Sequence, residues 1–267
     1  AWSDGNWGIT SSKISSTSAI VSWQQGTSGR DIYAAVVSYS GSTITVGTPT
    51  LIYSGSSTAS LGNKVLMLNS TNGFVFVSRN ADNIVVPFTL SGTTITVGTA
   101  SSTYGSSLSG TSLDIGQAIS MSSTVAVHTY RTNTSAPYTW VINTFAHNGS
   151  SAPTIGTASS TVSVGDNYAG PALFKIDSTN LVMAYSVVTT GYPVIRTATL
   201  SGTSAPTLNS ANTTVAMSSG NDGVNMGIFQ VSSTEYILYS GQYNFNYTLS
   251  GSTFTYVNYQ AYATYSP

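Results

Sequence analysis

The sequence predicts an all-β fold, a five-bladed β-propeller in which each blade is a four-stranded antiparallel meander. Three observations lead to this fold: a short motif recurs five times, apolar and polar residues alternate between its copies, and short polar turns separate the alternating runs. The motif reads SGSTITVGT from Ser40, SGTTITVGT from Ser91, NGSSAPTIGT from Asn148, SGTSAPTLNS from Ser201 and SGSTFTYVNY from Ser250. Its turn glycines are 51, 57, 53 and 49 residues apart. That interval fits one propeller blade and is too long for one rung of a β-helix.

The second repeat shows how each blade is assigned. Residues 64–69 form a short apolar strand, 70–73 a tight turn, 74–79 a second strand, 84–90 a third strand and 94–99 a fourth. The other repeats follow the same order, with short polar turns around Ser16, Thr71, Ser123, Ser178 and Ser233. We therefore expect one domain over residues 1–267, with blades at about 4–61, 62–112, 113–164, 165–220 and 221–267. Because each blade uses contiguous sequence, closure requires the first blade to pack against the fifth without a shared strand.

Composition narrows the function classes. The chain is 40% hydrophobic, only 6% charged and carries a net charge of −1 with seven basic residues. Nucleic-acid binding is not expected, because scattered basic residues cannot neutralise a run of phosphates. Membrane insertion is not expected, because no apolar run approaches the ~20 residues that span a bilayer. The chain contains no cysteine. It begins at Ala1 rather than Met, which fits either removal of a leader peptide or a boundary chosen within a longer sequence. We expect an extracellular or virion-surface location.

Meander geometry places the function on one side of the blades. The turns between strands one and two and between strands three and four lie on the same side, and they are all short. The opposite side carries connections of variable length, including 24–31, 79–82, 131–137 and 187–192. Variable loops on one side alone indicate that this side meets the partner.

A first column of candidate residues lies just before the inner strands. It comprises Asp4 in SDGNWG, Asn63 in LGNKV, Asp114 in LDIGQ, Asp166 in GDNYAG and Asp222 in NDGVNMG, with Trp7 and Tyr168 inside two of these motifs. One interpretation is a ring of oxygen ligands around the channel mouth, for sugar hydroxyls or for a Ca²⁺ ion. The other, which we favour, is that these side chains bond to their own backbone in Asx turns. No cofactor is predicted.

A second column lies at the end of the second strands. It comprises Trp23, Arg79, Tyr130, Arg131, Tyr185 and Tyr239, with Arg30 in the adjoining loop. Aromatic rings beside Arg and Asp form platforms for sugars, whose C–H faces stack on the ring while their hydroxyls bond to polar groups. The alternative is that the rings pack between neighbouring blades.

Catalytic and metal sites are weakly indicated. His128 and His147 are expected to be satisfied or strand-surface histidines, because they lack the spacing of a zinc site. The acids recur as equivalent groups rather than as a distinct pair, which suits repeated binding sites better than glycoside hydrolysis.

Strands such as STSAIVSW and STVAVHTYR, each followed by a polar loop and a strand closing in SGTTITVGT, resemble the repeats of bacteriophage tail-fibre and other virion-surface proteins. In architecture the chain is also similar to five-bladed propeller lectins. These resemblances imply a propeller at a virion or cell surface and assign no functional residues.

Three functions are compatible with the sequence. The first, which we favour, is a non-enzymatic virion-surface or secreted recognition module that binds cell-surface glycans at several similar sites on the variable loops. The second is a structural virion decoration or fibre subunit that contacts other surface proteins. The third is a five-bladed glycoside hydrolase.

Overall fold

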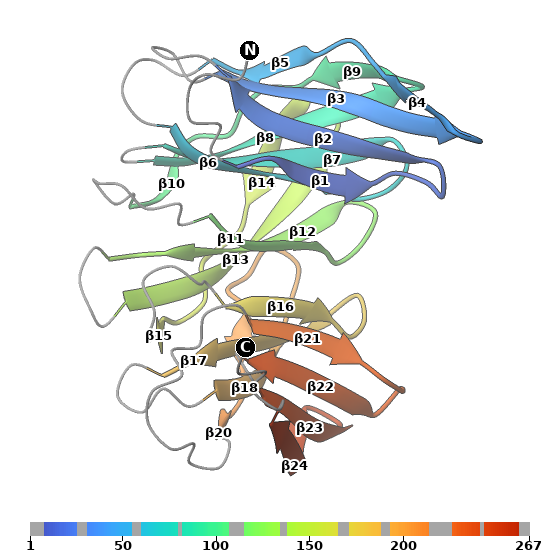
Figure 1. Cartoon of the computed structure of the whole chain (residues 1–267). Coiled ribbons are helices and arrows are strands. Elements are labelled where there is room, and N and C mark those ends of the chain that lie inside the picture. Colours follow the sequence, from blue (N-terminus) through green and yellow to red (C-terminus); the bar gives the residue numbers. More distant parts are fainter. Residues whose placement is uncertain are drawn as a thin grey trace, which may run out of the picture.

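The computed structural model describes residues 8–25, 31–54, 60–79, 82–106, 115–133, 138–164, 171–187, 193–213, 226–240 and 243–261. In these ranges the chain forms five antiparallel sheets, which follow one another in chain order and are called sheets 1 to 5 (Figure 1). Within the same ranges there is no helix that could cross a membrane.

Sheets 1 and 2 come from the blue and cyan parts of the chain in Figure 1. Sheet 1 contains β1 (Thr10–Lys13), β2 (Ser18–Gln25), β3 (Asp31–Ser40), β4 (Thr43–Val46) and β5 (Thr50–Tyr53). Sheet 2 contains β6 (Ser60–Met67), β7 (Asn72–Arg79), β8 (Asp82–Ser91), β9 (Thr94–Val97) and β10 (Tyr104–Ser106).

The remaining sheets repeat this order toward the C-terminus. Sheet 3 contains β11 (Ile115–Ser120), β12 (Val125–Arg131), β13 (Tyr138–Asn148), β14 (Ser151–Ile155) and β15 (Val162–Val164). Sheet 4 contains β16 (Ala172–Lys175), β17 (Asn180–Ser186), β18 (Pro193–Thr199), β19 (Thr207–Leu208) and β20 (Asn212–Thr213). Sheet 5 contains β21 (Met226–Gln230), β22 (Glu235–Ser240), β23 (Tyr243–Ser250) and β24 (Thr253–Ala261). The five predicted blades are confirmed as five antiparallel meanders.

The outermost strand differs from the prediction in four sheets, because it is broken into two parts. In sheet 2, β9 pairs with the end of β8 and β10 pairs with its beginning. The break follows β9, where the N–H of Gly98 donates to the carbonyl of Pro87 at 2.8 Å. Gly47, Gly156 and Asn209 make the equivalent bond in sheets 1, 3 and 4. The chain bends at this position, and the alternation of apolar and polar residues in the sequence does not predict such a bend.

The turn glycines explain why the motif recurs. Gly41, Gly92, Gly149, Gly202 and Gly251 all have φ between 56° and 68°. Side chains with a Cβ rarely adopt this left-handed conformation, so glycine is favoured at the turn between the third and fourth strands.

The same motif also joins consecutive sheets. The N–H of Thr99 donates to the carbonyl of Ser150 at 2.8 Å, and the N–H of Thr157 donates to that of Thr203 at 2.9 Å. Each acceptor follows the turn glycine of the next sheet. The end of one copy of the motif therefore binds the beginning of the following copy.

Replacing Gly98 with alanine tests this link. An alanine Cβ would lie 2.8 Å from the carbonyl oxygen of Ser150 and 3.0 Å from Pro87 Cγ, so the backbones of sheets 2 and 3 would have to separate. We expect the free energy of unfolding to fall by about 1 to 3 kcal/mol in urea titrations. The matched control is Gly227→Ala, whose Cβ would meet only ordinary contacts at 3.6 Å and beyond. Equal stability of the two variants would contradict the tight junction.

Among the described residues, four hydrophobic clusters form the core, and each lies between two consecutive sheets. Ile20 of sheet 1 packs with Val75 of sheet 2 in the first cluster, and Phe74 of sheet 2 packs with Phe145 of sheet 3 in the next. The third cluster joins sheets 3 and 4, and the fourth joins sheets 4 and 5. Each inner sheet thus has a forward face toward the next sheet and a rear face toward the preceding one. Packing of sheet 1 on sheet 5 within one chain stays a prediction.

Candidate functional site

Two ends of the sheets must be distinguished. The hairpin turns between the first and second strands and between the third and fourth strands lie at one end, which we call the turn end (Figure 1). The connections between the second and third strands lie at the other, which we call the loop end. This separation agrees with the meander predicted from the sequence.

Half of the predicted site residues lie outside the described residues. These are Asp4, Trp7, Arg30, Asp114, Asp166, Tyr168 and Asp222. They include every aspartate of the first column, so the ring of acids and its Ca²⁺ alternative stay predictions. Arg79 ends β7, where its backbone is paired with Asp82.

Asn63, the remaining member of that column, is a buried link between sheets. Its Oδ1 accepts hydrogen bonds from the hydroxyls of Ser22 and Thr10, the latter at 3.2 Å, and its Nδ2 donates to the carbonyl of Gly8 at 2.7 Å. All three partners belong to the first repeat, whereas Asn63 lies in β6. The side chain is therefore committed to joining sheet 2 to sheet 1.

The second column is less regular than the sequence motifs indicated. The backbone bond that closes the first turn runs from Met121 to Val125 in sheet 3 and from Val231 to Glu235 in sheet 5. Counting from this bond, Trp23, Tyr130 and Tyr185 are equivalent, whereas Tyr239 comes one residue earlier. Because side chains alternate along a strand, Tyr239 points to the forward face and the other three rings point to the rear face.

Tyr130 and Tyr185 pack between sheets. Tyr130 is only 4% exposed and contacts Tyr104 of sheet 2 edge to face, with ring centroids 5.3 Å apart. Burial raises the pKa of both tyrosines. Trp23 occupies the same position in sheet 1, where it stacks on Tyr33 at 6.2 Å and stays half-buried. For Tyr130 and Tyr185 the packing interpretation is the one that the structure supports.

The loop end of sheet 3 holds an ordered group of polar and aromatic side chains. The guanidinium carbon of Arg131 lies 4.9 Å from the centroid of the Tyr138 ring. The hydroxyls of Thr132 and Thr139 are 2.7 Å apart, and the N–H of Thr139 donates to Asn133 Oδ1 at 2.7 Å. Arg131 is buried, whereas the other four side chains are half-buried. We call these five residues the loop-base cluster.

The loop-base cluster was only partly visible in the sequence. Arg131 was predicted as a site residue, but Tyr138 begins the next strand and lies seven positions away. The pairing of β12 with β13 sets Arg131 opposite Trp140 and so brings the two strand ends together. This pairing is what places Tyr138 beside Arg131. A register of this kind follows from tertiary pairing and is not set by any local motif.

His128 lies in the core between sheets 2 and 3. It stacks on Phe76 with ring centroids 4.5 Å apart, and its Nδ1 is 3.1 Å from the hydroxyl of Tyr104. Its Nε2 has no hydrogen-bond partner among the described residues. Burial, reinforced by the positive charge of Lys64, lowers the pKa of His128 to about 3. The imidazole is therefore neutral at physiological pH and has a packing role.

His147 is hydrogen-bonded on both ring nitrogens. Its Nε2 donates to the carbonyl of Phe88 at 3.2 Å, and its Nδ1 accepts from the N–H of Gly149 at 3.1 Å. Burial lowers its pKa. The expectation of a satisfied histidine holds for His147, and within the described ranges no group of three His, Asp or Glu side chains is placed to hold a metal ion.

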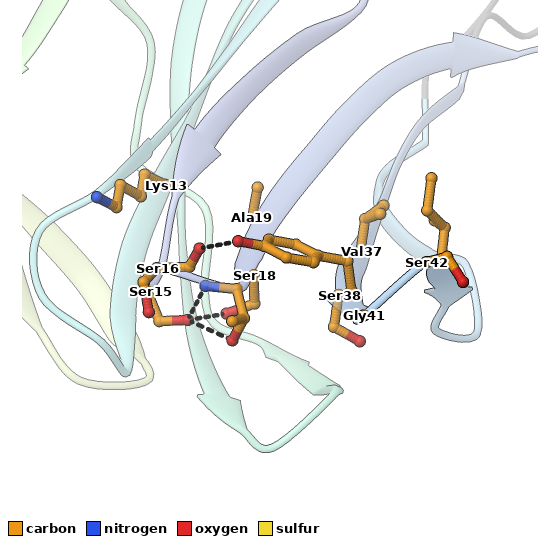
Figure 2. A pocket seen from close by; sticks show the side chains of 12 residues that line it. Lys13, Ser15, Ser16, Ser18, Ala19, Val37, Ser38, Gly41 and Ser42 are labelled. Atoms are coloured by element: carbon orange, nitrogen blue, oxygen red, sulfur yellow. Dashed lines mark hydrogen bonds between the residues drawn. The ribbon is translucent and has the colours of Figure 1, made fainter.

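A surface hollow of about 580 Å³ lies at the turn end of sheet 1 (Figure 2). Figure 2 shows Lys13, Ser15 and Ser18 on one side of it and Gly41 and Ser42 on the other, and Ile44 also belongs to the lining. The hydroxyl of Tyr39 spans it by donating to the carbonyl of Ser16 at 3.1 Å. Nothing in the sequence predicts a hollow here, because the turn end carries only short polar turns.

No protein-family model and no curated protein matches the chain. Among solved structures it is similar to the SapL1 lectin in complex with alpha methyl fucoside, with 10% identity over 97% of this chain and 80% of that chain and a TM-score of 0.47. It is also similar to the subtype N11 neuraminidase-like protein of A/flat-faced bat/Peru/033/2010 (H18N11), with 11% identity over 98% and 88% of the chains and a TM-score of 0.40. Hsv2 of Kluyvelomyces marxianus gives 7% identity over 97% and 99% and a TM-score of 0.32.

Proposed function

We propose that the chain is a non-enzymatic recognition module that binds neutral glycans at the loop end of its sheets. The observation that carries the proposal is the loop-base cluster of sheet 3, where Tyr138 lies beside hydroxyl, amide and guanidinium groups. An extracellular or virion-surface setting is part of the same proposal.

The chemistry of the loop-base cluster suits a sugar. A half-buried tyrosine offers an apolar ring surface to the C–H groups of a pyranose and a hydroxyl to its polar edge. Arg131 holds the Tyr138 ring from one side, and the bonded pair Thr132 and Thr139 fixes the strand ends on which the ring stands. A ring that is already positioned loses little conformational entropy when a ligand binds.

Recognition without catalysis is proposed because the acids of the sequence recur as equivalent groups rather than as one distinct pair. Among the described residues, the acids at the loop end are Asp31 and Asp82, which begin β3 and β8 of different sheets. The Asp31 carboxylate accepts a hydrogen bond from the Ser54 hydroxyl at 3.0 Å at the loop end of sheet 1. Asp177 and Glu235 lie instead at the turn ends of sheets 4 and 5. Hydrolysis of a glycosidic bond requires two carboxyl groups about 5 to 10 Å apart across the sugar. Release of reducing ends from a glycan panel would support a glycoside hydrolase and contradict this proposal.

Replacing Tyr138 with alanine is expected to weaken glycan binding about tenfold, because a stacking contact of this kind contributes about 1 to 1.5 kcal/mol. Binding is measured by glycan array and by saturation-transfer NMR at millimolar sugar. The control is Tyr39→Ala, which removes an exposed tyrosine far from the cluster, at the turn end of sheet 1. If Tyr138→Ala bound glycans as tightly as the unmodified chain, Tyr138 would not belong to the binding site. If the unmodified chain bound no glycan, the proposed function would be wrong.

A structural subunit of a larger assembly is the second candidate. It is favoured by apolar side chains that are exposed on sheets 1 and 5, including Ile44, Val46 and Phe229. Groups of exposed apolar side chains, here one on sheet 1 and one on sheet 5, are typical of protein contact surfaces.

A further inference from the structure

The internal junctions of the chain all use the same two faces. The forward face of sheets 1 to 4 packs against the rear face of the following sheet, and one hydrophobic cluster fills each junction. Among the described residues, two such faces have no neighbouring sheet in this arrangement: the rear face of sheet 1 and the forward face of sheet 5. Figure 1 shows these sheets at opposite ends of the molecule, with sheets 2 to 4 between them.

The rear face of sheet 1 exposes apolar positions that are buried in the other sheets. Ile44 is 71% exposed, whereas its equivalents Ile95 and Phe254 are 6% and 2% exposed. Tyr39 is exposed, whereas Leu90 occupies the same position in sheet 2 and is buried. What differs is that sheet 1 covers this face of sheet 2, whereas no sheet among the described residues covers the rear face of sheet 1. The residue types at these positions are those of a junction.

The forward face of sheet 5 shows the complementary pattern. Phe229 and Val231 are each 60% exposed, whereas Met121, the equivalent of Val231 in sheet 3, is fully buried. Phe174 is the equivalent of Phe229 in sheet 4, where it packs into the cluster with sheet 5. Sheet 5 therefore carries the apolar half of a junction whose other half is a rear face.

Sheets 5 and 1 also carry polar side chains at the positions that are hydrogen-bonded across the junction between sheets 4 and 5. In sheet 4, Thr197 accepts a hydrogen bond from Asn209 Nδ2 at 2.7 Å, and its hydroxyl donates to the carbonyl of Ser252 at 2.8 Å. In sheet 5, Asn246 and Asn258 occupy the positions of Thr197 and Asn209, and their side chains are bonded to each other. The residue equivalent to Ser252 in sheet 1 is Ser42, which lies on the rim of the hollow in Figure 2.

We propose that the partner of this surface is a second copy of the chain, with the forward face of sheet 5 from one copy packed on the rear face of sheet 1 from the next. The hollow at Ser42 then receives the edge of sheet 5 near Asn246, as Ser252 receives Thr197 within the chain. This head-to-tail contact is heterologous, so it builds a ring of copies if the rotation closes and a filament if it does not. The inference names the partner for the second candidate function and is independent of glycan binding.

Disulfide trapping tests the contact, because the chain has no cysteine of its own. Single variants Ser42→Cys and Asn246→Cys are mixed in equal amounts and oxidised mildly, since a disulfide needs Cα atoms within about 7 Å. The expected result is a reducible dimer in which position 42 of one copy is linked to position 246 of the other, identified by peptide mass spectrometry. The matched control pairs Ser42→Cys with Lys175→Cys, a substitution at an exposed position of sheet 4 that should give no specific dimer.

The double variant Ser42→Cys with Asn246→Cys separates association from closure within one chain. If oxidation links the two introduced thiols inside a single chain and the mixed single variants stay unlinked, sheet 1 packs on its own sheet 5 and the proposal is wrong. Sedimentation velocity gives a second measurement: Ile44→Asp, at an exposed position, should weaken association at least about tenfold without unfolding the chain. A concentration-independent monomer for the unmodified chain would equally overturn the second-copy contact.

Discussion

Replacing Phe76 with alanine is expected to lower the free energy of unfolding by about 3 to 5 kcal/mol. Phe76 is fully buried between sheets 2 and 3, and its ring stacks on His128 and meets Phe145 edge to face at 5.3 Å. The substitution removes apolar contact area and leaves a cavity, because the flanking strands are held in register by their own ladders. Urea unfolding followed by fluorescence and circular dichroism measures the loss.

The control for this prediction is the same substitution at an exposed phenylalanine. Phe229→Ala removes a ring that is 60% exposed on the forward face of sheet 5. At protein concentrations too low for association we expect its stability to change by less than about 0.5 kcal/mol. If Phe76→Ala lowered the free energy of unfolding no more than Phe229→Ala does, the cluster between sheets 2 and 3 would not be part of the folded core.

Stability is also expected to fall steeply as the pH is lowered from 6.5 toward 3. His128 has a folded-state pKa of about 3 and an ordinary value of 6.5, so in this window the unfolded chain binds a proton that the folded chain does not. Each pH unit then removes about 1.4 kcal/mol, or about 3 kcal/mol between pH 6.5 and 4. The lowered pKa of His147 acts in the same direction.

His128→Gln identifies the group responsible. Glutamine does not titrate and still offers an oxygen to the Tyr104 hydroxyl. Between pH 6 and 4 the free energy of unfolding of this variant should therefore fall by about 1.4 kcal/mol less per pH unit than that of the unmodified chain. Hydrogen bonds from Asn180 and Thr179 lower the pKa of Asp177 to about 2. The stability that this carboxylate contributes is therefore lost only below about pH 4. An unchanged slope in His128→Gln, with His147→Gln as the comparison, would contradict this assignment.

Several elements could be predicted because their signal is local. A glycine in a short polar turn just before a strand predicts a hairpin, and all five turn glycines have positive φ, so the five copies set the number and order of the sheets. The broken outer strand could not be predicted in this way. In sheet 2 the break coincides with the close approach of Gly98 to Ser150, a residue of the next sheet.

The candidate site likewise combines a residue chosen from the sequence with a residue placed by strand pairing. Arg131 was selected from the sequence, whereas Tyr138 joined it only through the pairing of β12 with β13. For Tyr130 and Tyr185 the sequence left a sugar platform and packing between sheets as alternatives, and in the structure both side chains are buried between sheets. Aromatic side chains serve both purposes equally well, so residue type cannot separate them.

By itself the sequence determined the all-β class, the five repeats, the end of the sheets that carries the loops and the neutral, weakly charged surface. These features depend on backbone preferences and on the period-two alternation of side chains, both of which are properties of neighbouring residues. Only the tertiary structure decided which side chains are covered. Burial depends on the sheet that lies opposite, and for that reason equivalent residues such as Ile44 and Ile95 have opposite environments.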